Sequence, residues 1–407
     1  MTAPEVTVIR DPARLPTLDG EWDDLLARSA SDTVFLTWDW LRTWYEVYGA
    51  EVEPCVVLVR ENGRLVAAAP LKIEARRLYG LRVRQLEFIG TGRAVCPDFL
   101  DLVIEAGREA ELARVLLGAL RSEPGWDRIA LSDLPASSPV REPLEAAMTA
   151  ARLRPFRQVD RTCPYLTLPG TWAELEQRLT HNFRRNHRKK RRRLGAALVH
   201  WDAGQSVRDA LATLATLHQG RMETSGRGGN FRKPDYLAFH QRFAERAAQR
   251  GWLYLAFMHK DGRAIAGRYG FVYRGTYYAY QSGFDPTAGD DSPGEVLLGM
   301  VIEDLIGRGV REFNFLRGPQ PHKFHWADRS RETLRVEGWR HTALGPPLAG
   351  LDRLAAIGRR VRRRWAGIAP APRSGRRASA PAPRDAPAGR CCVRARSRPR
   401  PDGGSWR

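Results

Sequence analysis

Two segments of the chain repeat one pattern of apolar and polar positions. "CVVLVRENGRLVAAAPLKI" (55–73) and "LYLAFMHKDGRAIAGRYGFVY" (253–273) each place a polar turn between two apolar runs, with Asn62-Gly63 in the first turn and Asp261-Gly262 in the second. These dipeptides tolerate the positive φ angles of a two-residue loop, so each segment predicts a β-hairpin. Each hairpin follows two helical stretches and precedes a strand, a helix and a second strand. We therefore expect two α/β domains of similar plan, joined near residues 160–175.

The segment after the second hairpin, "GTYYAYQSGFDPTAGDDSPGEVLLGMVIEDLIGRGVREFNFLRG" (275–318), predicts a strand, a polar loop, a helix and another strand. Ser292 is placed to cap the helix and Pro293 stands in its first turn. The first amides of such a helix form an anion site that can grip a pyrophosphate. An ordinary crossover with a well-capped helix explains the same pattern. The motifs GxGxxG and GxxxxGK[ST] are absent, which removes the main support for nucleotide-binding classes.

The most basic segment, "HNFRRNHRKKRRRLGAALVHW" (181–201), lies at the entrance to the second domain and predicts a helix followed by a strand. The segment from Arg184 to Arg193 contains eight Lys or Arg residues. These like charges repel one another unless solvent screens them or anions neutralise them. Two interpretations stay open. The run is a solvated helix face, or Arg184, Arg185 and Asn186 contact a phosphate-bearing cofactor, a substrate or RNA.

The positive charge of the chain is concentrated in two segments. The net charge is +20, but fifteen Arg and two Asp between Arg359 and Arg407, together with the run 184–193, account for the excess. The rest of the chain is about neutral, which argues against DNA binding by a basic surface. A hydrophobic content of 43% excludes a wholly disordered chain. The five cysteines form no CxxC pair, so neither a disulfide framework nor a zinc site is indicated.

The N-terminal stretch "MTAPEVTVIRDPARLP" lacks the apolar core of a signal peptide, and no apolar run approaches the roughly 20 residues that span a bilayer. We therefore expect a cytoplasmic protein. Residues 346–367 predict a basic amphipathic helix, which either contacts an anionic membrane peripherally or docks on the second domain. Residues 368–407 are rich in Arg, Pro and Ala, and we expect a disordered tail.

The order of these motifs resembles the GNAT-fold acyltransferases of the FemAB-like and CelD-like (cellulose biosynthesis protein CelD) group. The resemblance rests on "FRRNHRKKRRRL", on the "GFDP…SPG" loop and on "FNFLRG…HKFHWAD", and it covers about residues 20–340. It implies an α/β (α+β) fold of tandem GNAT-like domains, at 1–165 and 166–345, each a mixed, mostly antiparallel sheet flanked by helices. The chain departs from the group's pattern at the "DDSPGEV" loop, at Asn314 and at His322.

The resemblance also implies an activity: transfer of an acyl group, acetyl above all, from acyl-CoA to an amine or hydroxyl of a cell-envelope or polysaccharide-related acceptor. The thioester is already activated, so the protein has to hold both reactants, polarise the carbonyl and remove a proton. On this interpretation the helix start at Ser292, Pro293, Gly294 and Glu295 binds the CoA pyrophosphate. The alternatives are a Fem-type transferase that draws on aminoacyl-tRNA, and a noncatalytic RNA- or membrane-binding protein.

Tyr280, Asp285 and Lys323 are the candidate catalytic residues. Tyr280 and Asp285 lie where the thioester is expected, and either could serve as the general acid or base. The alternative is a structural role for both, with Tyr280 packing in a strand and Asp285 forming a turn. Lys323 and Arg317 flank a Gly-Pro-rich turn, where a cation can stabilise an oxyanion or bind an anionic acceptor, with a plain surface charge as the alternative.

Two further pairs of residues are candidates for binding a ligand. Trp38 and Trp40 could stack on a saccharide acceptor, but their helical spacing is more typical of a core. His322 and His325 lack a third ligand, so no metal site is predicted.

Overall fold

The computed structural model describes residues 4–202, 204–224, 226, 228–288, 291–342 and 345–368. Its contacts group residues 1–356 into one compact unit, and the residues from Ile357 onward form a second unit. The predicted tail, 368–407, lies outside the described residues except for Ile368. Among the residues described, no helix is both long and apolar enough to cross a bilayer.

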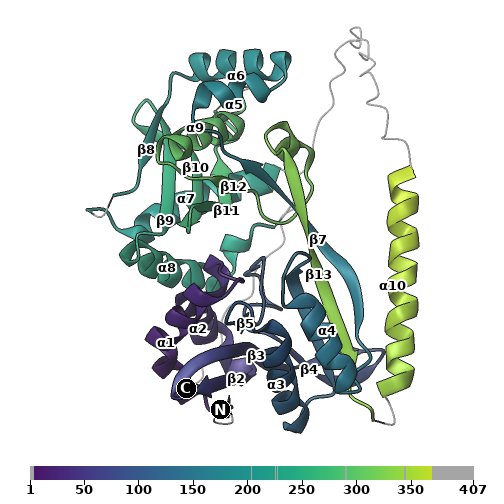
Figure 1. Ribbon diagram of the computed structural model, residues 1–407. Coiled ribbons are helices and arrows are strands. Elements are labelled where there is room, and N and C mark those ends of the chain that lie inside the picture. Colours follow the sequence, from purple (N-terminus) through teal and green to yellow (C-terminus); the bar gives the residue numbers. More distant parts are fainter. Residues whose placement is uncertain are drawn as a thin grey trace, which may run out of the picture. The chain divides into compact units, whose positions relative to one another are not determined.

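One sheet runs through the first unit, with strand order β1-β2-β3-β4-β6-β13-β7-β12-β11-β10-β9-β8 and β5 paired to β3 (Figure 1). Neighbouring strands are antiparallel except for two parallel pairs, β4–β6 and β11–β12. A mixed, mostly antiparallel sheet flanked by helices is the predicted fold class, and it is confirmed. The strands are β1 (Glu5–Ile9), β2 (Glu53–Glu61), β3 (Arg64–Leu78), β4 (Leu81–Phe88), β5 (Val103–Ile104), β6 (Arg128–Pro135), β7 (Phe156–Thr167), β8 (Ala197–His200), β9 (Leu253–Lys260), β10 (Arg263–Tyr273), β11 (Thr276–Phe284), β12 (Glu312–Asn314) and β13 (Arg329–Trp339).

The two halves of the chain follow the same order of elements. The first half has two helices, a hairpin, a strand, a helix and a strand (α1, α2, β2–β3, β4, α3, β6), and the second repeats them (α7, α8, β9–β10, β11, α9, β12). The central residues of both hairpin turns have positive φ, 50° at Asn62 and 77° at Gly63, then 50° at Asp261 and 74° at Gly262, which confirms the predicted loops.

The helices have the following bounds. They are α1 (Asp19–Arg28), α2 (Trp38–Tyr48), α3 (Glu109–Ser122), α4 (Arg141–Ala150), α5 (Trp172–Arg178), α6 (His181–Leu194), α7 (Val207–Thr224), α8 (Pro234–Gln249), α9 (Pro293–Gly307) and α10 (Gly345–Ile368), with short 3₁₀ turns at Pro12–Leu18, Val34–Leu36, Gly49–Glu51, Asn230–Arg232 and Pro321–His325.

The halves exchange strands where they meet. β13, from the end of the chain, pairs with β6 of the first half, and β7 pairs with both β13 and β12. The predicted domain limit after residue 165 falls inside β7. Because each half supplies the strand that covers an edge of the other, the sheet continues from one to the other without an open edge.

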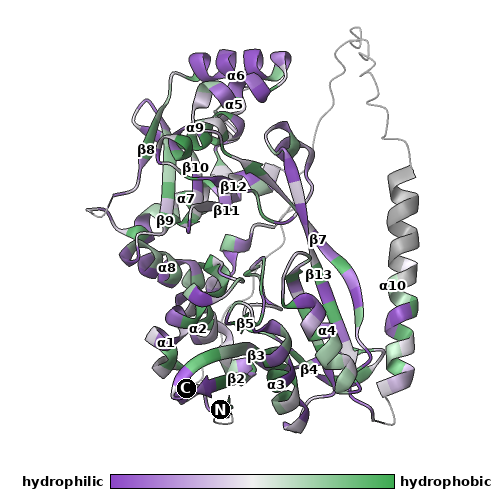
Figure 2. Ribbon diagram, viewed as in Figure 1, coloured by the Kyte–Doolittle hydropathy of each residue, from purple (hydrophilic) through white to green (hydrophobic). Residues whose placement is uncertain are grey.

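Helix α9 lies between the sheet and the basic helix α6. Figure 2 shows the contrast between the two, with α6 hydrophilic and α9 hydrophobic. A Cβ at Gly299 of α9 would overlap the ring of His187, one of the two buried residues of α6, so the helices touch at a position that only Gly allows. The arginine-rich segment is therefore packed into the fold along one face.

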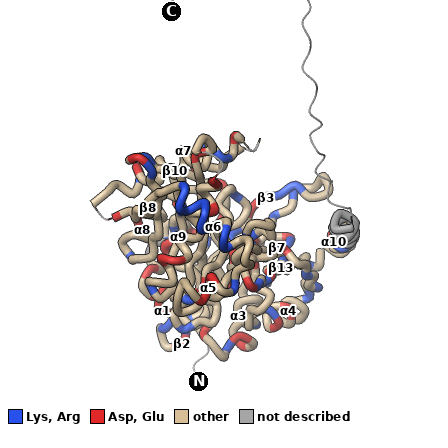
Figure 3. The backbone as a smooth tube through the Cα atoms, turned by 90° about the horizontal axis from the view of Figure 1, so that it is seen from above, with Lys and Arg blue, Asp and Glu red and all other residues tan. Residues whose placement is uncertain are grey.

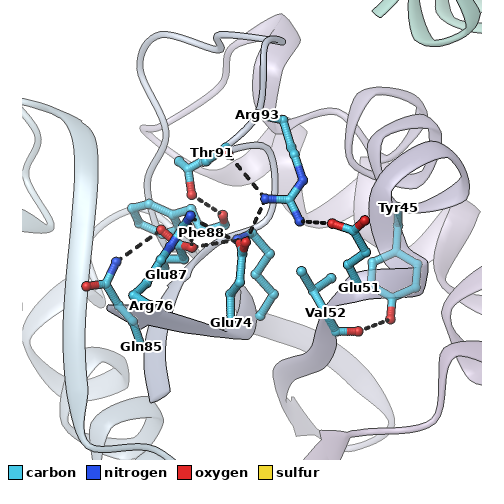
Figure 4. A network of polar contacts seen from close by, with 12 residues as sticks. Tyr45, Glu51, Val52, Glu74, Arg76, Gln85, Glu87, Phe88, Thr91 and Arg93 are labelled. Carbon is cyan, nitrogen blue, oxygen red and sulfur yellow. Dashed lines mark hydrogen bonds and ion pairs between the residues drawn. The ribbon is translucent and has the colours of Figure 1, made fainter. Parts of the chain in front are cut away.

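A closed ion network covers the polar face of β3 and β4 (Figure 4). Lys72 has no exposed surface, and its Nζ lies 2.7 Å from carboxylates of both Glu74 and Glu87. Arg76 contacts Glu87 at 2.6 Å and Arg93 contacts Glu74 at 2.6 Å. Although burial acts to raise it, these cations hold the pKa of Glu87 at about 2. Arg93 also pairs with Glu51 at 3.0 Å, so three cations face three carboxylates, which is the pattern of a structural network.

The beginning of α10 packs against β4, β6 and β13. Leu348 contacts Val83 and Trp339, while Asp352 accepts hydrogen bonds from Trp339 Nε1 at 2.8 Å and from Arg128 Nη2 at 2.9 Å. The predicted docked helix therefore begins as expected, but its first turns lie on strands of both halves and not on the second half alone.

Candidate active site

The sheet opens where β11 and β12 diverge. These parallel strands pair only from Thr276 to Tyr278, whereas β11 continues to Phe284. Tyr280 is the extra residue of a bulge opposite β10, because Gln281 pairs with Tyr269 and Ala279 with Gly270. Bulges redirect side chains and occur next to active sites. Beyond Tyr278, β11 therefore has a strand neighbour on one side only, and two cavities lie beside it.

The larger cavity has a volume of about 610 Å³ and is built by both halves. A loop of the first half reaches it, and α7, β11 and the turn after β12 complete it. Its polar lining includes Cys96, Asp98, His218, Arg221, Asn230, Tyr236, Arg268, Tyr280, Gln281, Ser282, Arg317, Gln320, His322 and Lys323.

The smaller cavity, about 500 Å³, lies at the beginning of α9. It adjoins the larger one, because Arg221, Arg268, Ser282, Leu298 and His322 line both. Cavities of these sizes are typical of small-molecule sites.

The N-terminal end of α9 brings together the four residues predicted to bind a pyrophosphate, but with few free amides. Pro293 has no N–H, and the amides of Glu295 and Val296 both donate to the carbonyl of Ser292, at 2.9 and 3.2 Å. Ser292 holds the predicted cap position, yet its positive φ of 51° leaves its hydroxyl without a bond to the helix. That hydroxyl accepts from Lys190 Nζ at 3.0 Å.

Side chains supply the positive charge around the smaller cavity. Lys190 also forms an ion pair with Glu295 at 3.1 Å, which neutralises the carboxylate in the first turn of α9. Arg221 and Arg268 lie along the wall that the two cavities share. At the start of α9 the residues present therefore fit an anionic group such as a CoA phosphate mainly through Lys190, and the helix amides contribute little.

Tyr280 lines the larger cavity and its hydroxyl accepts a hydrogen bond from the backbone N of Cys96 at 3.1 Å. Burial raises the pKa of Tyr280 well above its usual value, so the phenol keeps its proton at neutral pH. Since the bond from Cys96 uses an acceptor position, the hydroxyl proton stays available for donation.

Asp285 lies at the rim of the smaller cavity, where its carboxylate forms a turn. Oδ1 accepts from the amide of Thr287 at 2.8 Å and from its hydroxyl at 2.6 Å, and Oδ2 pairs with Arg263 at 2.8 Å. The bonds from Thr287 hold the pKa of Asp285 below its usual value. An ionised, fully bonded carboxylate is a weak proton acceptor.

Lys323 lines the larger cavity, but its ammonium is engaged by the backbone. Nζ donates to the carbonyls of Phe315 at 2.9 Å, Leu316 at 3.2 Å and Arg317 at 2.8 Å, which accounts for its three donors. Leu316 has a φ of 55°, so these bonds hold a turn in a left-handed conformation. Burial lowers the pKa of Lys323 to about 8, with Asp98 acting against it.

Arg317 is clamped by carboxylates of the first half. Its Nε lies 2.7 Å from Asp98 Oδ1, its backbone N donates to Asp98 Oδ2 at 2.8 Å, and its Nη2 lies 3.0 Å from Asp133 Oδ1. Nη2 also donates to the carbonyl of Pro97. These bonds fix the loop of Asp98 against the turn after β12, and so shape the wall of the larger cavity.

The basic run forms α6, as predicted, and Figure 3 shows the blue of its Lys and Arg residues along the helix. Four form ion pairs: Arg188–Glu176, Lys190–Glu295, Arg191–Glu303 and Arg193–Asp291. Arg184 donates to the carbonyl of Glu176 at 3.2 Å. Arg185, Lys189 and Arg192 have no ion pair with any described residue, and their spacing puts them on one helix face. Arg184, Arg185 and Asn186 line neither cavity.

Trp38 and Trp40 belong to the core. Their exposed fractions are 1% and 0%. Trp40 packs edge-on against Phe239 and Phe243 of α8, with ring centroids 4.8 and 4.7 Å apart. Trp40 therefore joins the halves, Trp38 packs on Trp22, and neither ring presents an open face to a saccharide.

Two site residues were missed by reasoning from the sequence. His218 of α7 lines the larger cavity; burial lowers its pKa to about 4, with Arg221 acting in the same direction, and its Nδ1 has no hydrogen-bond partner in the described structure. It follows apolar residues of the helix, so nothing marked it. Arg268 lines both cavities. An arginine inside the apolar run "AIAGRYGFVY" was a visible signal.

With this geometry established, comparison with known proteins identifies the fold. Residues 181–324 match the family model described as "Acetyltransferase (GNAT) domain". The structure titled "Crystal structure of FemX" is 11% identical, with a TM-score of 0.58 over 85% of this chain and 99% of that chain. A conserved protein of unknown function from Bacteroides thetaiotaomicron VPI-5482 is 12% identical, with a TM-score of 0.51 over 82% of this chain and 100% of that chain. No curated protein matches the chain.

The chain therefore contains a GNAT-fold acetyltransferase domain, and nearly its whole first unit shares the fold of FemX. At these identities the structural likeness shows the fold alone. The assignment to a CelD-like group stays a prediction, as do the roles of the individual site residues.

Proposed function

We propose that this protein is an acyltransferase that moves an acyl group, acetyl above all, from acyl-CoA to an amine or hydroxyl of a cell-envelope or polysaccharide-related acceptor. The observation that carries the proposal is the pair of adjoining cavities beside β11, within the segment that matches the acetyltransferase domain. Two connected cavities suit a reaction that must hold two substrates with their reacting atoms in contact.

The donor enters the smaller cavity in this proposal. Lys190 and the amide of Gly294, both at the start of α9, would hold its phosphates. When bound, acyl-CoA supplies an activated thioester, so the protein needs no covalent intermediate of its own. The acceptor enters the larger cavity, where polar groups from both halves orient it.

Proton transfer is assigned to His218 and Tyr280. His218 lines the larger cavity and is neutral at pH 7, because burial lowers its pKa to about 4, so it can accept the proton of the attacking amine or hydroxyl as the new bond forms. Tyr280 keeps its own proton until the C–S bond breaks and then donates it to the leaving sulfur. The proton on His218 returns to Tyr280 through solvent, which restores both groups. Lys323 acts as a positioning residue, because its three bonds to carbonyls fix the turn that closes the larger cavity.

One alternative is an aminoacyl-tRNA-dependent transferase. The likeness to FemX covers 85% of the chain, and Arg185, Lys189 and Arg192 form a cationic stripe that makes no ion pair with a described carboxylate. Such a stripe attracts a phosphate backbone, and its binding weakens steeply as salt is added. A noncatalytic RNA- or membrane-binding protein would use the same stripe without the cavities.

The test is calorimetric titration of the full chain with acetyl-CoA and, separately, with total tRNA at two salt concentrations, followed by an assay of CoA thiol release. Ser282→Trp fills the junction of the cavities, and the matched control Ser330→Trp places the same ring on an exposed position of β13. We expect saturable acetyl-CoA binding that Ser282→Trp abolishes and Ser330→Trp retains.

Two other results would contradict the acyl-CoA proposal. tRNA binding that persists at moderate salt without acetyl-CoA binding moves the assignment to the aminoacyl-tRNA alternative. Binding of neither ligand overturns the catalytic proposal.

A further inference from the structure

Arg268 places a charge where the fold otherwise buries apolar groups. It lies in the middle of β10, beside the buried residues Gly267 and Tyr269, and its side chain lines both cavities. A central strand of a sheet is an expensive place for a guanidinium, because burial removes the water that stabilises the charge.

No carboxylate among the described residues forms an ion pair with Arg268. Its Nε is buried without a hydrogen-bond partner, and so is the hydroxyl of Tyr277 on the neighbouring strand β11. Arg263, on the same strand, shows the usual arrangement, since it pairs with Asp285 at 2.8 Å.

The acids around the cavities are already engaged by other cations. Asp98 is held by Arg317 at 2.7 Å. Asp285 pairs with Arg263, and Glu295 pairs with Lys190. The lining therefore has an excess of positive charge at its centre, unlike the balanced network on β3 and β4.

A second cation, Arg221, reinforces this excess at the junction. Arg221 and His322 line both cavities with Arg268, and the positive charges of Arg221, Lys323 and Arg268 all lower the pKa of His322, after burial itself. A cluster of like charges in a half-buried site raises the free energy of the empty protein. A bound anion would offset that energy directly.

We propose that the acceptor substrate carries an anionic group, a carboxylate or a phosphate, and that Arg268 binds it at the junction of the two cavities. This inference rests on the proposed acyl transfer and narrows its acceptor class to anionic amines or alcohols. The acceptor is the source of the anion because the thioester end of acyl-CoA is uncharged and its phosphates lie at the far end of the pantetheine arm. A guanidinium binds carboxylate and phosphate oxygens in two parallel hydrogen bonds, which also orients the nucleophile.

The first experiment needs no known substrate. Thermal unfolding of the full chain is followed with inorganic phosphate, sulfate or acetate against chloride at constant ionic strength, for the wild type, Arg268→Met and the control Arg208→Met. Arg208 forms an exposed pair with Glu245 on α7 and α8, so its substitution removes the same charge away from the cavities. We expect saturable stabilisation of the wild type and of Arg208→Met by at least one oxyanion, and none of Arg268→Met.

The same variants separate a binding charge from a structural one. Without added anion, Arg268→Met should unfold at the same temperature as the wild type or higher, because the substitution removes an unpaired charge. A lower melting temperature of this variant without anion, or equal stabilisation of all three proteins by oxyanions, overturns the proposal.

The second experiment identifies the source of the anion. Acetyl transfer is measured for pairs of acceptors that differ only in the charged group, glucosamine 6-phosphate against glucosamine and alanine against alaninamide. We expect the anionic member to be preferred, and Arg268→Met to raise its KM on the order of 100-fold with a smaller change in kcat. Arg268→Lys should restore part of the preference.

Acetyl-CoA binding distinguishes this inference from the proposed function. If Arg268→Met leaves the Kd of acetyl-CoA unchanged, Arg268 serves the acceptor as proposed. If it weakens acetyl-CoA binding by a similar factor, Arg268 binds the donor and the acceptor assignment is overturned. If the wild type binds no acetyl-CoA, the proposed function fails, while the oxyanion titration still decides whether Arg268 is an anion site.

Discussion

Substitution of Arg317 tests how far the two halves depend on one charged contact. Arg317→Met keeps most of the side-chain length but removes the guanidinium that lies 2.7 Å from Asp98 and 3.0 Å from Asp133. Asp98 has no exposed surface, so water cannot replace the lost partner. Two buried carboxylates would then remain beside each other without an ion-pair partner among the described residues.

The expected loss of stability follows from this geometry. Removal of one member of a buried ion pair costs about 3–5 kcal/mol, because the partner stays behind desolvated. The compact unit spans residues 1–356. Its unfolding entropy is roughly 0.75 kcal/mol per kelvin, so the melting temperature should fall by roughly 4–7 °C.

The loss should also depend on pH in a defined direction. Burial raises the pKa of Asp98 and raises that of Asp133 to about 7, with Arg317 opposing both shifts. Without Arg317 the folded-state values rise further above the unfolded ones. A carboxyl with a raised pKa contributes stability that is present at low pH and is lost as pH rises through the folded value. The deficit of Arg317→Met should therefore be small at pH 5.5 and largest at pH 8.5.

The assay is thermal unfolding of the wild type, Arg317→Met and the exposed-pair control Arg208→Met at pH 5.5, 7 and 8.5. The control should lose at most about 1 kcal/mol at every pH. A deficit of Arg317→Met below about 1 kcal/mol, or one that is the same at pH 5.5 and 8.5, would refute the argument from buried charge.

Three further predictions concern the candidate site. Gly283→Ala should destabilise the protein by about 3 kcal/mol, because the added Cβ would overlap the backbone N of His218 in α7. The control Gly118→Ala has nothing within 4 Å of the added Cβ and should stabilise the protein by about 0.5–1 kcal/mol. Urea unfolding measures both variants, and similar effects of the two would argue against close packing of α7 on β11. Tyr280→Phe should lower kcat roughly 100-fold and cost only about 1 kcal/mol of stability, and an unchanged kcat removes Tyr280 from the proton-transfer scheme. Lys323→Met should cost about 2–3 kcal/mol through the three released carbonyls, and a fall in activity without any fall in stability would instead assign Lys323 to the chemistry.

Features with local causes could be predicted from the sequence. The hairpins at Asn62-Gly63 and Asp261-Gly262 follow from the backbone freedom of those residues, and α9 follows from apolar periodicity behind Pro293. The repeat of the same elements in both halves, and with it the fold class, was predictable for that reason. Local pattern also placed Tyr280 and the start of α9 near one another, because one strand and one loop connect them.

The electrostatic roles of the site residues were decided by tertiary structure alone. Arg317 meets Asp98, 219 positions earlier in the chain, and this pairing turns a predicted substrate-binding cation into a clamp between the halves. Trp40 packs against α8 for a similar reason. A charge is free or paired according to which distant segments the sheet brings together. The sequence by itself therefore determined which elements form and in what order, while strand exchange between the halves decided which of their charges face a partner and which, like Arg268, face an open cavity.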